Sequence, residues 1–497
     1  MKSALPRYST LEPLLPSPST LSTPSSAESS DSSTQRYSAQ LPRYSAILNS
    51  PPPAGQRRVP RAQQQTEHTF RLSKTEGKSN YSGNASGKPW ATMTVLSTSL
   101  AKHKVPRFFG GDQIAGFVEL ELEAPLAVQS VSISLRGKII TSPLVDGAHQ
   151  FLDHSFIVWS KTQGDPRTVL SSSSSTNSNT NSKKFDGKLQ GSYSWTFSFP
   201  FPTQVTVPAR GERSVESYPS PQTVQERDIS ARVEYELTLR IAHGMFKADS
   251  KVQTNVLYIP KILPDLLPLL RQHAYREGKP LIGPHEDVGG WTTLPKVSVR
   301  GALNRKPVLL DCVLSLGGPT CYTRGTVIPC YITISSTNPE ALDRLASPDT
   351  INARLVRHVK FYKDSKKLLG VTEEVAEIQT AVWWIPSDLS IQETGRRCLE
   401  GEIHLDKDLQ PSCDLVLFRI EYFVELLPFK SLLIETNASK KESVLLSYPI
   451  EIGTFHADGP TPKPFTKPLK KITSSKHRGS PNSQWPLAAD ARLAGLL

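Results

Sequence analysis

Residues 116–123 have the sequence Gly-Phe-Val-Glu-Leu-Glu-Leu-Glu, in which apolar and acidic side chains alternate from Phe117 onward. A period of two places Val118, Leu120 and Leu122 on one face of an extended strand and the glutamates on the other. One apolar and one polar face are typical of an antiparallel sheet that is covered on a single side, whereas parallel strands are apolar on both faces. This stretch therefore predicts an antiparallel β-sandwich.

The same alternation recurs along the chain, while helical periodicity is nearly absent. It predicts strands at residues 131–135, 193–199, 233–241 and 251–259. Prolines follow two of these strands and end them, because proline cannot donate to a ladder. A second series begins near Trp291, and its strand candidates are residues 297–299, 308–316, 327–334, 354–362, 380–385, 415–426 and 443–452. We therefore predict an all-β fold with two antiparallel, immunoglobulin-like β-sandwiches.

These patterns also divide the chain. We expect one sandwich at residues 67–260, a connector at residues 261–290 and a second sandwich at residues 291–456. The flanking residues 1–66 and 457–497 are rich in Ser, Pro, Thr, Gln or Lys and contain too few apolar side chains to offset their ordering entropy by burial. We predict that both are disordered tails.

Two internal segments stand apart from the strand pattern. Four prolines lie in the connector, and we expect them to break any helix that its leucines could form; they are Pro264, Pro268, Pro280 and Pro284. Residues 171–184 consist of Ser, Thr, Asn and Lys, and they predict a long exposed loop whose charge phosphorylation could change.

The net charge of +12 is unevenly distributed. Residues 1–66 carry +4 and residues 456–497 carry +5, which leaves only +3 for the folded part of the chain. Such a fold has no basic face, so we do not expect a nucleic-acid partner. The basic run of the second tail lies on an anionic membrane surface, serves as a nuclear address, or is simply solvated; it consists of Lys463, Lys467, Lys470, Lys471, Lys476 and Arg478.

Compartment and chemistry are inferred from what the sequence lacks. No segment approaches the roughly 18 apolar residues of a spanning helix, and the N-terminus does not resemble a signal peptide, so we expect a cytoplasmic protein. Five cysteines without metal-ligand spacing predict free thiols and no metal. No nucleophile elbow, phosphate-binding loop or zinc-protease motif occurs, so we expect neither an enzyme nor a cofactor. Gly110-Gly111 fits a hairpin turn better than a phosphate cradle.

The string Leu-Pro-Arg-Tyr-Ser occurs twice in the first tail, at Leu5–Ser9 and at Leu41–Ser45. Proline holds the chain near the polyproline II conformation, and an aromatic side chain two residues later is presented on that preformed ridge to an aromatic-lined groove. The repeat therefore predicts a docking motif. Two alternatives stay open: duplication without use, and, because residues 36–38 repeat only Arg-Tyr-Ser, a kinase that reads this shorter unit.

Residues 108–118 (Phe-Phe-Gly-Gly-Asp-Gln-Ile-Ala-Gly-Phe-Val) and 128–137 (Val-Gln-Ser-Val-Ser-Ile-Ser-Leu-Arg-Gly) resemble the opening of arrestin N-domains. In that family an aromatic and glycine-rich turn leads into a strand, and the following strand ends in Leu-x-Gly. Residues 193–202, 229–239 and 251–260 are similar to later strands of the same domain.

The second half of the chain continues the resemblance. Residues 317–338 look like the start of an arrestin C-domain, and residues 444–455 look like its final proline-containing strand. The likeness covers roughly residues 67–456 and implies an arrestin-like pair of sandwiches; a generic immunoglobulin-like pair is the alternative. Cargo-contact residues cannot be transferred position by position.

The alpha-arrestin branch of this family, which includes the fungal arrestin-related trafficking adaptors, is similar in combining two sandwiches with Pro-Tyr motifs that recruit WW domains of HECT-type ubiquitin ligases. In that branch the motif usually follows the folded domains, whereas both copies precede them here. The resemblance implies that the proline packs on a groove aromatic and that the tyrosine enters a pocket. The implied contact residues are Leu5, Pro6, Tyr8, Leu41, Pro42 and Tyr44.

Two binding functions follow from the resemblance. In the first, the protein is an adaptor that brings the ligase to the cytosolic parts of membrane transporters or receptors, for ubiquitination and endocytic sorting at the plasma membrane or endosomes. In the second, it is a ligase-independent trafficking or signalling scaffold of arrestin or retromer-subunit type. Changing both motif tyrosines to alanine separates the two.

Overall fold

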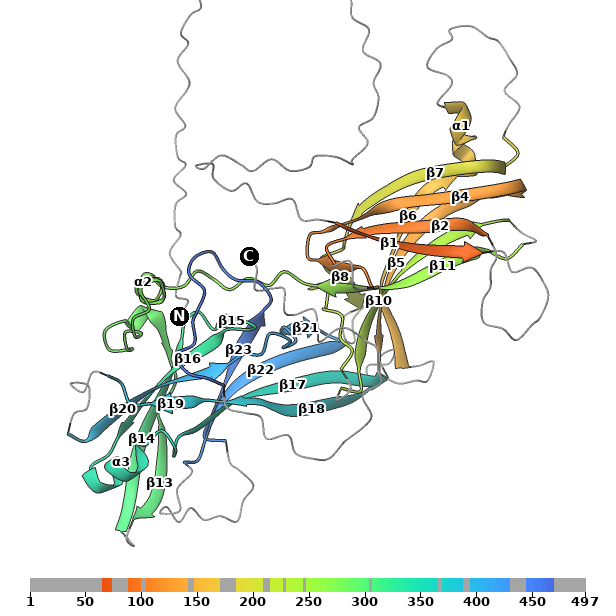
Figure 1. Cartoon of the computed structure of the whole chain (residues 1–497). Coiled ribbons are helices and arrows are strands. Elements are labelled where there is room, and N and C mark those ends of the chain that lie inside the picture. Colours follow the sequence, from red (N-terminus) through yellow and green to blue (C-terminus); the bar gives the residue numbers. More distant parts are fainter. Residues whose placement is uncertain are drawn as a thin grey trace, which may run out of the picture. The chain divides into compact units, whose positions relative to one another are not determined.

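The structure, a computed structural model, describes most of the chain between residues 65 and 468 (Figure 1). The described residues are 65–73, 88–99, 104–141, 147–169, 185–208, 215–226, 229–244, 247–303, 306–364, 369–387, 394–429 and 444–468.

The first sandwich is built from two sheets that contribute to an apolar core. One sheet has the strand order β1-β2-β4-β7, and the other has the order β3-β11-β10-β5-β6. Strand β3 pairs in parallel with β11, and the other neighbours pair antiparallel. The strands are β1 (Thr66–Ser73), β2 (Pro89–Ser97), β3 (Arg107–Phe109), β4 (Gln113–Ala127), β5 (Ser130–Ile140), β6 (Ala148–Ser160), β7 (Lys188–Pro200), β10 (Arg232–Ala242) and β11 (Ser250–Ile259).

Strand β4 follows the alternation that the sequence shows. Val118 and Leu120 are fully buried, while Glu119 and Glu121 are exposed. Burial of one such leucine side chain contributes about 2 kcal/mol, so this register is strongly preferred over a one-residue slip that would expose every apolar side chain. The predicted antiparallel sandwich is confirmed for this half of the chain.

Gly110 and Gly111 lie between β3 and β4, which belong to different sheets. The prediction of a hairpin turn is therefore wrong, because a hairpin joins two strands of one ladder. Gly111 has φ +92°, a left-handed conformation that glycine adopts without strain. The carboxylate of Asp112 accepts the N–H of Phe109 at 2.8 Å and closes the turn. The two glycines thus carry the chain from one sheet to the other.

A helix, α2 (Leu269–Glu277), occupies the segment between the sandwiches. The prediction that the prolines break any helix here is wrong. Pro268 is the N-cap residue of α2, where the missing N–H leaves no helical hydrogen bond unmade. Gly278 ends the helix in the left-handed conformation at φ +67°. The prolines bound the helix and do not interrupt it.

The second sandwich also has two sheets (Figure 1). One has the order β12-β14-β16-β20-β19, with β13 also paired to β14; the other has the order β15-β23-β22-β17-β18, with β21 also paired to β22. The strands are β12 (Trp291–Thr293), β13 (Val297–Leu303), β14 (Lys306–Gly317), β15 (Cys321–Thr323), β16 (Val327–Ser335), β17 (Asn352–Asp364), β18 (Leu369–Thr380), β19 (Val382–Trp384), β20 (Arg396–His404), β21 (Cys413–Leu415), β22 (Phe418–Leu427) and β23 (Leu446–Gly453). The predicted second sandwich is confirmed as well.

Shorter elements complete the described chain. Strands β8 (Gln204–Pro208) and β9 (Val215–Pro219) pair with each other. The helices are α1 (Pro166–Val169) and α3 (Pro339–Leu345), with single 3-10 turns at Lys161–Gln163 and Val288–Gly290. The side chain of Asn338 caps α3 by accepting the N–H of Ala341 at 3.0 Å.

The five cysteines are free thiols, as predicted. Three of them are buried: Cys312, Cys330 and Cys398. Burial raises the pKa of the Cys312 thiol to about 12, which keeps it protonated and unreactive at neutral pH. Among the described residues, no group of His, Cys, Asp and Glu side chains has the arrangement of a metal site.

The chain stays in contact with the second sandwich beyond its last strand. The N–H groups of Phe465 and Thr466 donate to the carboxylate of Glu402 on β20. The structure thus describes residues 457–468 of the predicted tail, and two of them contact β20. Isolated prolines and lysines suggested a solvated segment, but backbone N–H groups bind a carboxylate whatever side chains they carry.

Candidate functional site

The docking residues predicted from the sequence lie outside the described residues. This applies to Leu5, Pro6, Tyr8, Leu41, Pro42 and Tyr44, and also to the polar insert at residues 171–184. The described part of the chain offers two other candidate sites: the attachment of that insert and a polar cluster that joins the two sandwiches.

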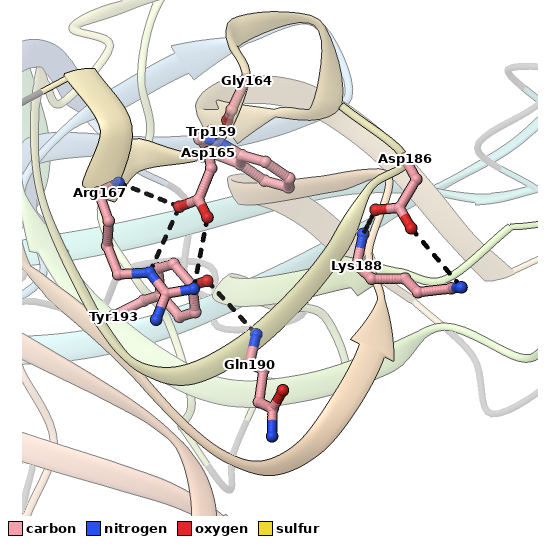
Figure 2. Close-up of polar contacts among 8 residues, drawn as sticks. All are labelled: Trp159, Gly164, Asp165, Arg167, Asp186, Lys188, Gln190 and Tyr193. Carbon is pink, nitrogen blue, oxygen red and sulfur yellow. Dashed lines mark hydrogen bonds and ion pairs between the residues drawn. The ribbon is translucent and has the colours of Figure 1, made fainter. Parts of the chain in front are cut away.

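The segment that leads into the insert is fixed on the first sandwich by Arg167 (Figure 2). Asp165 accepts the N–H of Arg167 at 3.0 Å, and its second carboxylate oxygen lies 3.3 Å from the Arg167 guanidinium. The side-chain hydrogen bond from the guanidinium to Asp165 raises the pKa of Arg167. The guanidinium lies over the ring of Tyr193 on β7, 4.6 Å from the ring centroid, and the indole N–H of Trp159 donates to the carbonyl oxygen of Gly164 at 3.0 Å.

The segment that leads out of the insert has its own anchor (Figure 2). Asp186 accepts the N–H of Lys188 at 2.9 Å, and this hydrogen bond lowers the pKa of the Asp186 carboxyl group. Two residues later the N–H of Gln190 donates to the hydroxyl of Tyr193 at 3.3 Å. Tyr193 therefore holds both flanks, because its ring contacts Arg167 and its hydroxyl contacts Gln190. The described flanks of the insert thus meet at Tyr193.

The second candidate site begins with a segment of the first sandwich, residues 219–226, that runs alongside β10 and β11. The hydroxyl of Ser220 donates to the carbonyl oxygen of Pro202, and Thr223 exchanges two hydrogen bonds with the backbone of Tyr258. The buried hydroxyl of Tyr235 donates to the carbonyl oxygen of Pro221 at 2.7 Å. These contacts hold the segment on a rigid aromatic core in which the rings of Phe201 and Tyr258 stack 4.2 Å apart.

Gln222 and Glu226 project from this segment and contact the second sandwich. The side-chain amide of Gln222 donates to Gln410 Oε1 at 2.6 Å and accepts from Arg324 at 3.4 Å. Arg324 also donates to the carbonyl oxygen of Leu409 at 3.2 Å. Burial lowers the pKa of Arg324, but an arginine stays charged at any physiological pH. We call the five side chains of this site the polar junction: Gln222, Glu226, Arg324, Arg357 and Gln410.

Arg357 and Glu226 form the ion pair of the polar junction. Arg357 Nη1 lies 3.0 Å from Glu226 Oε2, and the two side chains are 10% and 27% exposed. Arg357 lies on β17 among the buried positions Leu355, Val359 and Phe361, so its stem is packed in the sandwich while its guanidinium reaches Glu226. A charge in this position is stabilised chiefly by its partner.

We expect Glu226→Gln to lower the free energy of unfolding by about 1 kcal/mol, because the amide keeps the shape of the side chain but leaves the Arg357 guanidinium without a counter-charge in a partly buried place. Denaturant titration of the full chain measures this change. The matched control is Glu123→Gln, which removes the partner of Lys88 from an ion pair whose two side chains are mostly exposed. Equal effects of the two substitutions would contradict the role given to the polar junction.

Sequence reasoning missed the polar junction, although one signal was present. Residues 353, 355, 357, 359 and 361 have the period of two of a buried strand face, and position 357 alone among them is charged. A charged residue within an apolar face indicates a buried partner. The identity of that partner, Glu226, could not be inferred because it lies 131 positions away and has no pattern of its own.

Residues 98–262 match the family model of the arrestin (or S-antigen) N-terminal domain. The first sandwich is therefore similar to an arrestin N-terminal domain. This match supports a likeness to arrestin proteins over about a third of the chain. No curated protein matches the chain.

The arrestin match encloses strands β3 to β11, the glycine turn at residues 110–111 and the segment that carries Gln222 and Glu226. The insert between β6 and β7 also falls within the matched range. No helix within the described residues is both long enough and apolar enough to cross a membrane.

Proposed function

We propose that this protein is an adaptor of the alpha-arrestin type, which recruits a HECT-type ubiquitin ligase through the WW domains of the ligase. Its cargo would be the cytosolic parts of membrane transporters or receptors, which are thereby ubiquitinated and sorted into endosomes. The observation that carries the proposal is the pair of Leu-Pro-Arg-Tyr-Ser strings ahead of an arrestin N-terminal domain. Neither feature alone would select a ligase.

The spacing of the two motifs supports binding to tandem WW domains. Tyr8 and Tyr44 are 36 residues apart, and a flexible chain of that length spans roughly 30 to 35 Å. Two linked domains of one ligase can then be occupied together, so that avidity adds to a weak individual contact. Phosphorylation of either tyrosine would oppose docking, because a dianion does not enter an apolar pocket without a large desolvation cost.

The test is the variant with both Tyr8→Ala and Tyr44→Ala in the full chain. We expect its affinity for a purified tandem WW fragment to fall by more than about tenfold in isothermal titration calorimetry, because both aromatic anchors are lost. Each single substitution should have a smaller effect. The matched control is Tyr37→Ala, since Arg36-Tyr37-Ser38 lacks the Leu-Pro pair and should not contribute.

Two results would contradict the proposal. Unchanged WW binding by the double variant would exclude the two motifs as the WW-binding sites. An effect of Tyr37→Ala as large as that of Tyr8→Ala or Tyr44→Ala would indicate that the shorter Arg-Tyr-Ser unit is recognised. If cargo sorting in cells were unchanged while WW binding was lost, the ligase-independent scaffold would be the better description.

A further inference from the structure

The C-terminal segment at residues 460–468 is bound to the second sandwich through one buried carboxylate. Glu402, on β20, is 2% exposed. Its oxygens accept the N–H of Phe465 at 3.1 Å, the N–H of Thr466 at 2.7 Å, and the hydroxyl of Thr466. His404 Nε2 lies 3.2 Å from the same carboxylate and 3.0 Å from Thr466 Oγ1.

This arrangement makes Glu402 a receptor for the segment. Strand β20 lies between β16 and β19, where Glu402 pairs with Pro329 on one side and with Val382 on the other. A carboxylate in such a position is costly unless hydrogen bonds replace its water. Three donors come from Phe465 and Thr466, and none of the three depends on a charged side chain.

The ring of Phe465 completes the contact. It lies 6.3 Å from the ring of Trp384 on β19 and forms one wall of a small cavity. Trp291, Tyr331 and Leu281 line the same cavity. Detachment of the segment would therefore expose aromatic surface on the second sandwich as well as the carboxylate of Glu402.

We propose that residues 460–468 are an intramolecular ligand of the second sandwich and that phosphorylation of Thr466 releases them. A phosphate on Thr466 Oγ1 would replace the hydroxyl donor by a group carrying nearly two negative charges, directly against the Glu402 carboxylate. The bond to Glu402 would become a repulsion between like charges in a place with little water.

The surroundings of Thr466 define the enzyme class. Lys463 lies three residues before it and Lys467 directly follows, with Lys470 and Lys471 beyond, which suits a basophilic serine/threonine protein kinase. The kinase transfers the γ-phosphoryl group of a nucleoside triphosphate: the bond from phosphorus to the diphosphate breaks, the bond to Thr466 Oγ1 forms, and the hydroxyl proton passes to the base of the kinase. Thr466 is half-buried, so the kinase acts on the detached segment and the phosphate then prevents it from rebinding.

The proposal is tested by hydrogen exchange of the full-length protein with Thr466→Glu. We expect amide exchange over residues 460–468 to be about tenfold faster or more in this variant, while exchange on β16 stays unchanged. Thr466→Val removes the hydroxyl donor but keeps both N–H donors. Its exchange rate over residues 460–468 should therefore lie between those of Thr466→Glu and the wild type. Thr461→Glu adds the same charge to an exposed side chain of the same segment and should behave as wild type.

A second measurement uses the protein phosphorylated on Thr466 in vitro, compared with the same protein after phosphatase treatment. Faster exchange that the phosphatase reverses supports the proposal. Wild-type protection of residues 460–468 in both Thr466→Glu and the phosphorylated protein would overturn it, and so would an equal effect of Thr461→Glu. Faster exchange on β16 would indicate general unfolding and would also count against a local release.

Discussion

Replacing Gly116 by alanine should lower the free energy of unfolding by about 3 kcal/mol, the upper part of the usual range for an overpacked interior. Gly116 lies in β4 and pairs with Val95 in β2 and with Phe197 in β7. A Cβ atom there would lie 2.0 Å from the carbonyl oxygen of Thr94 and 2.9 Å from Phe197 Cζ. Because the closest atom belongs to the backbone of a paired strand, relief requires part of the ladder to separate.

Thermal or denaturant unfolding of the full chain, monitored in the first sandwich by hydrogen exchange, measures this effect. Gly289→Ala is the matched control, because a Cβ atom at Gly289 has no neighbour within 4 Å. That substitution should change stability by less than about 1 kcal/mol. Similar unfolding midpoints for the two variants would contradict this prediction. They would show that β2 can move away from the added methyl group at little cost in stability.

Replacing Arg271 by methionine should lower the free energy of unfolding of the second sandwich by about 3 kcal/mol. The reason is the loss of two hydrogen bonds donated by a charged group, each of which contributes at least about 1.5 kcal/mol. Arg271 is on α2 and is 3% exposed. Its guanidinium donates to the carbonyl oxygens of Gly290 and Gly318, each at 2.7 Å, and lies 4.9 Å from the ring centroid of Trp291. Methionine fills the space of the stem but leaves both carbonyl oxygens without this donor.

Arg271→Lys should recover only a small part of the loss, because an ammonium group cannot reach two carbonyl oxygens with the planar fork of a guanidinium. The control is Arg276→Met on the same helix, whose exposed guanidinium contacts Gln272. Hydrogen exchange of residues 281–291 reports the change locally. If Arg271→Met and Arg276→Met lowered stability by the same amount, α2 would not be anchored through Arg271.

Alternating strands could be predicted from the sequence wherever one face is buried and the other is solvated, as in β4, β7, β10 and β11. Strands β6 and β18 were missed because each is the last strand of its sheet, where apolar side chains such as Val371 and Val375 remain exposed and blur the pattern. Strand β20 was missed for the opposite reason, because a polar residue occupies a buried position. Glu402 is covered by the returning C-terminal segment, and its charge disguises the buried face of the strand.

The sites were harder to predict than the strands. The polar junction had one signal, the charge of Arg357 on an apolar face, but its partners come from distant turns. The docking of Phe465 and Thr466 had no such signal, because two of the three donors to Glu402 are backbone N–H groups and composition does not report where a backbone N–H points. The glycines of residues 110–111 were recognised as turn formers, yet which strands they join depends on sheet assignment. The prolines around α2 were interpreted as helix breakers, although they lie at its ends.

The double anchorage at Tyr193 has a practical consequence for protein engineering. Since Arg167 and Gln190 are both fixed on Tyr193, the distance between the two ends of the insert is set by the sandwich and not by the number of residues between them. Closing a loop of twice the length costs only about 0.6 kcal/mol more. A fluorescent reporter or an affinity peptide spliced between Val169 and Phe185 should therefore leave the folding of the first sandwich intact.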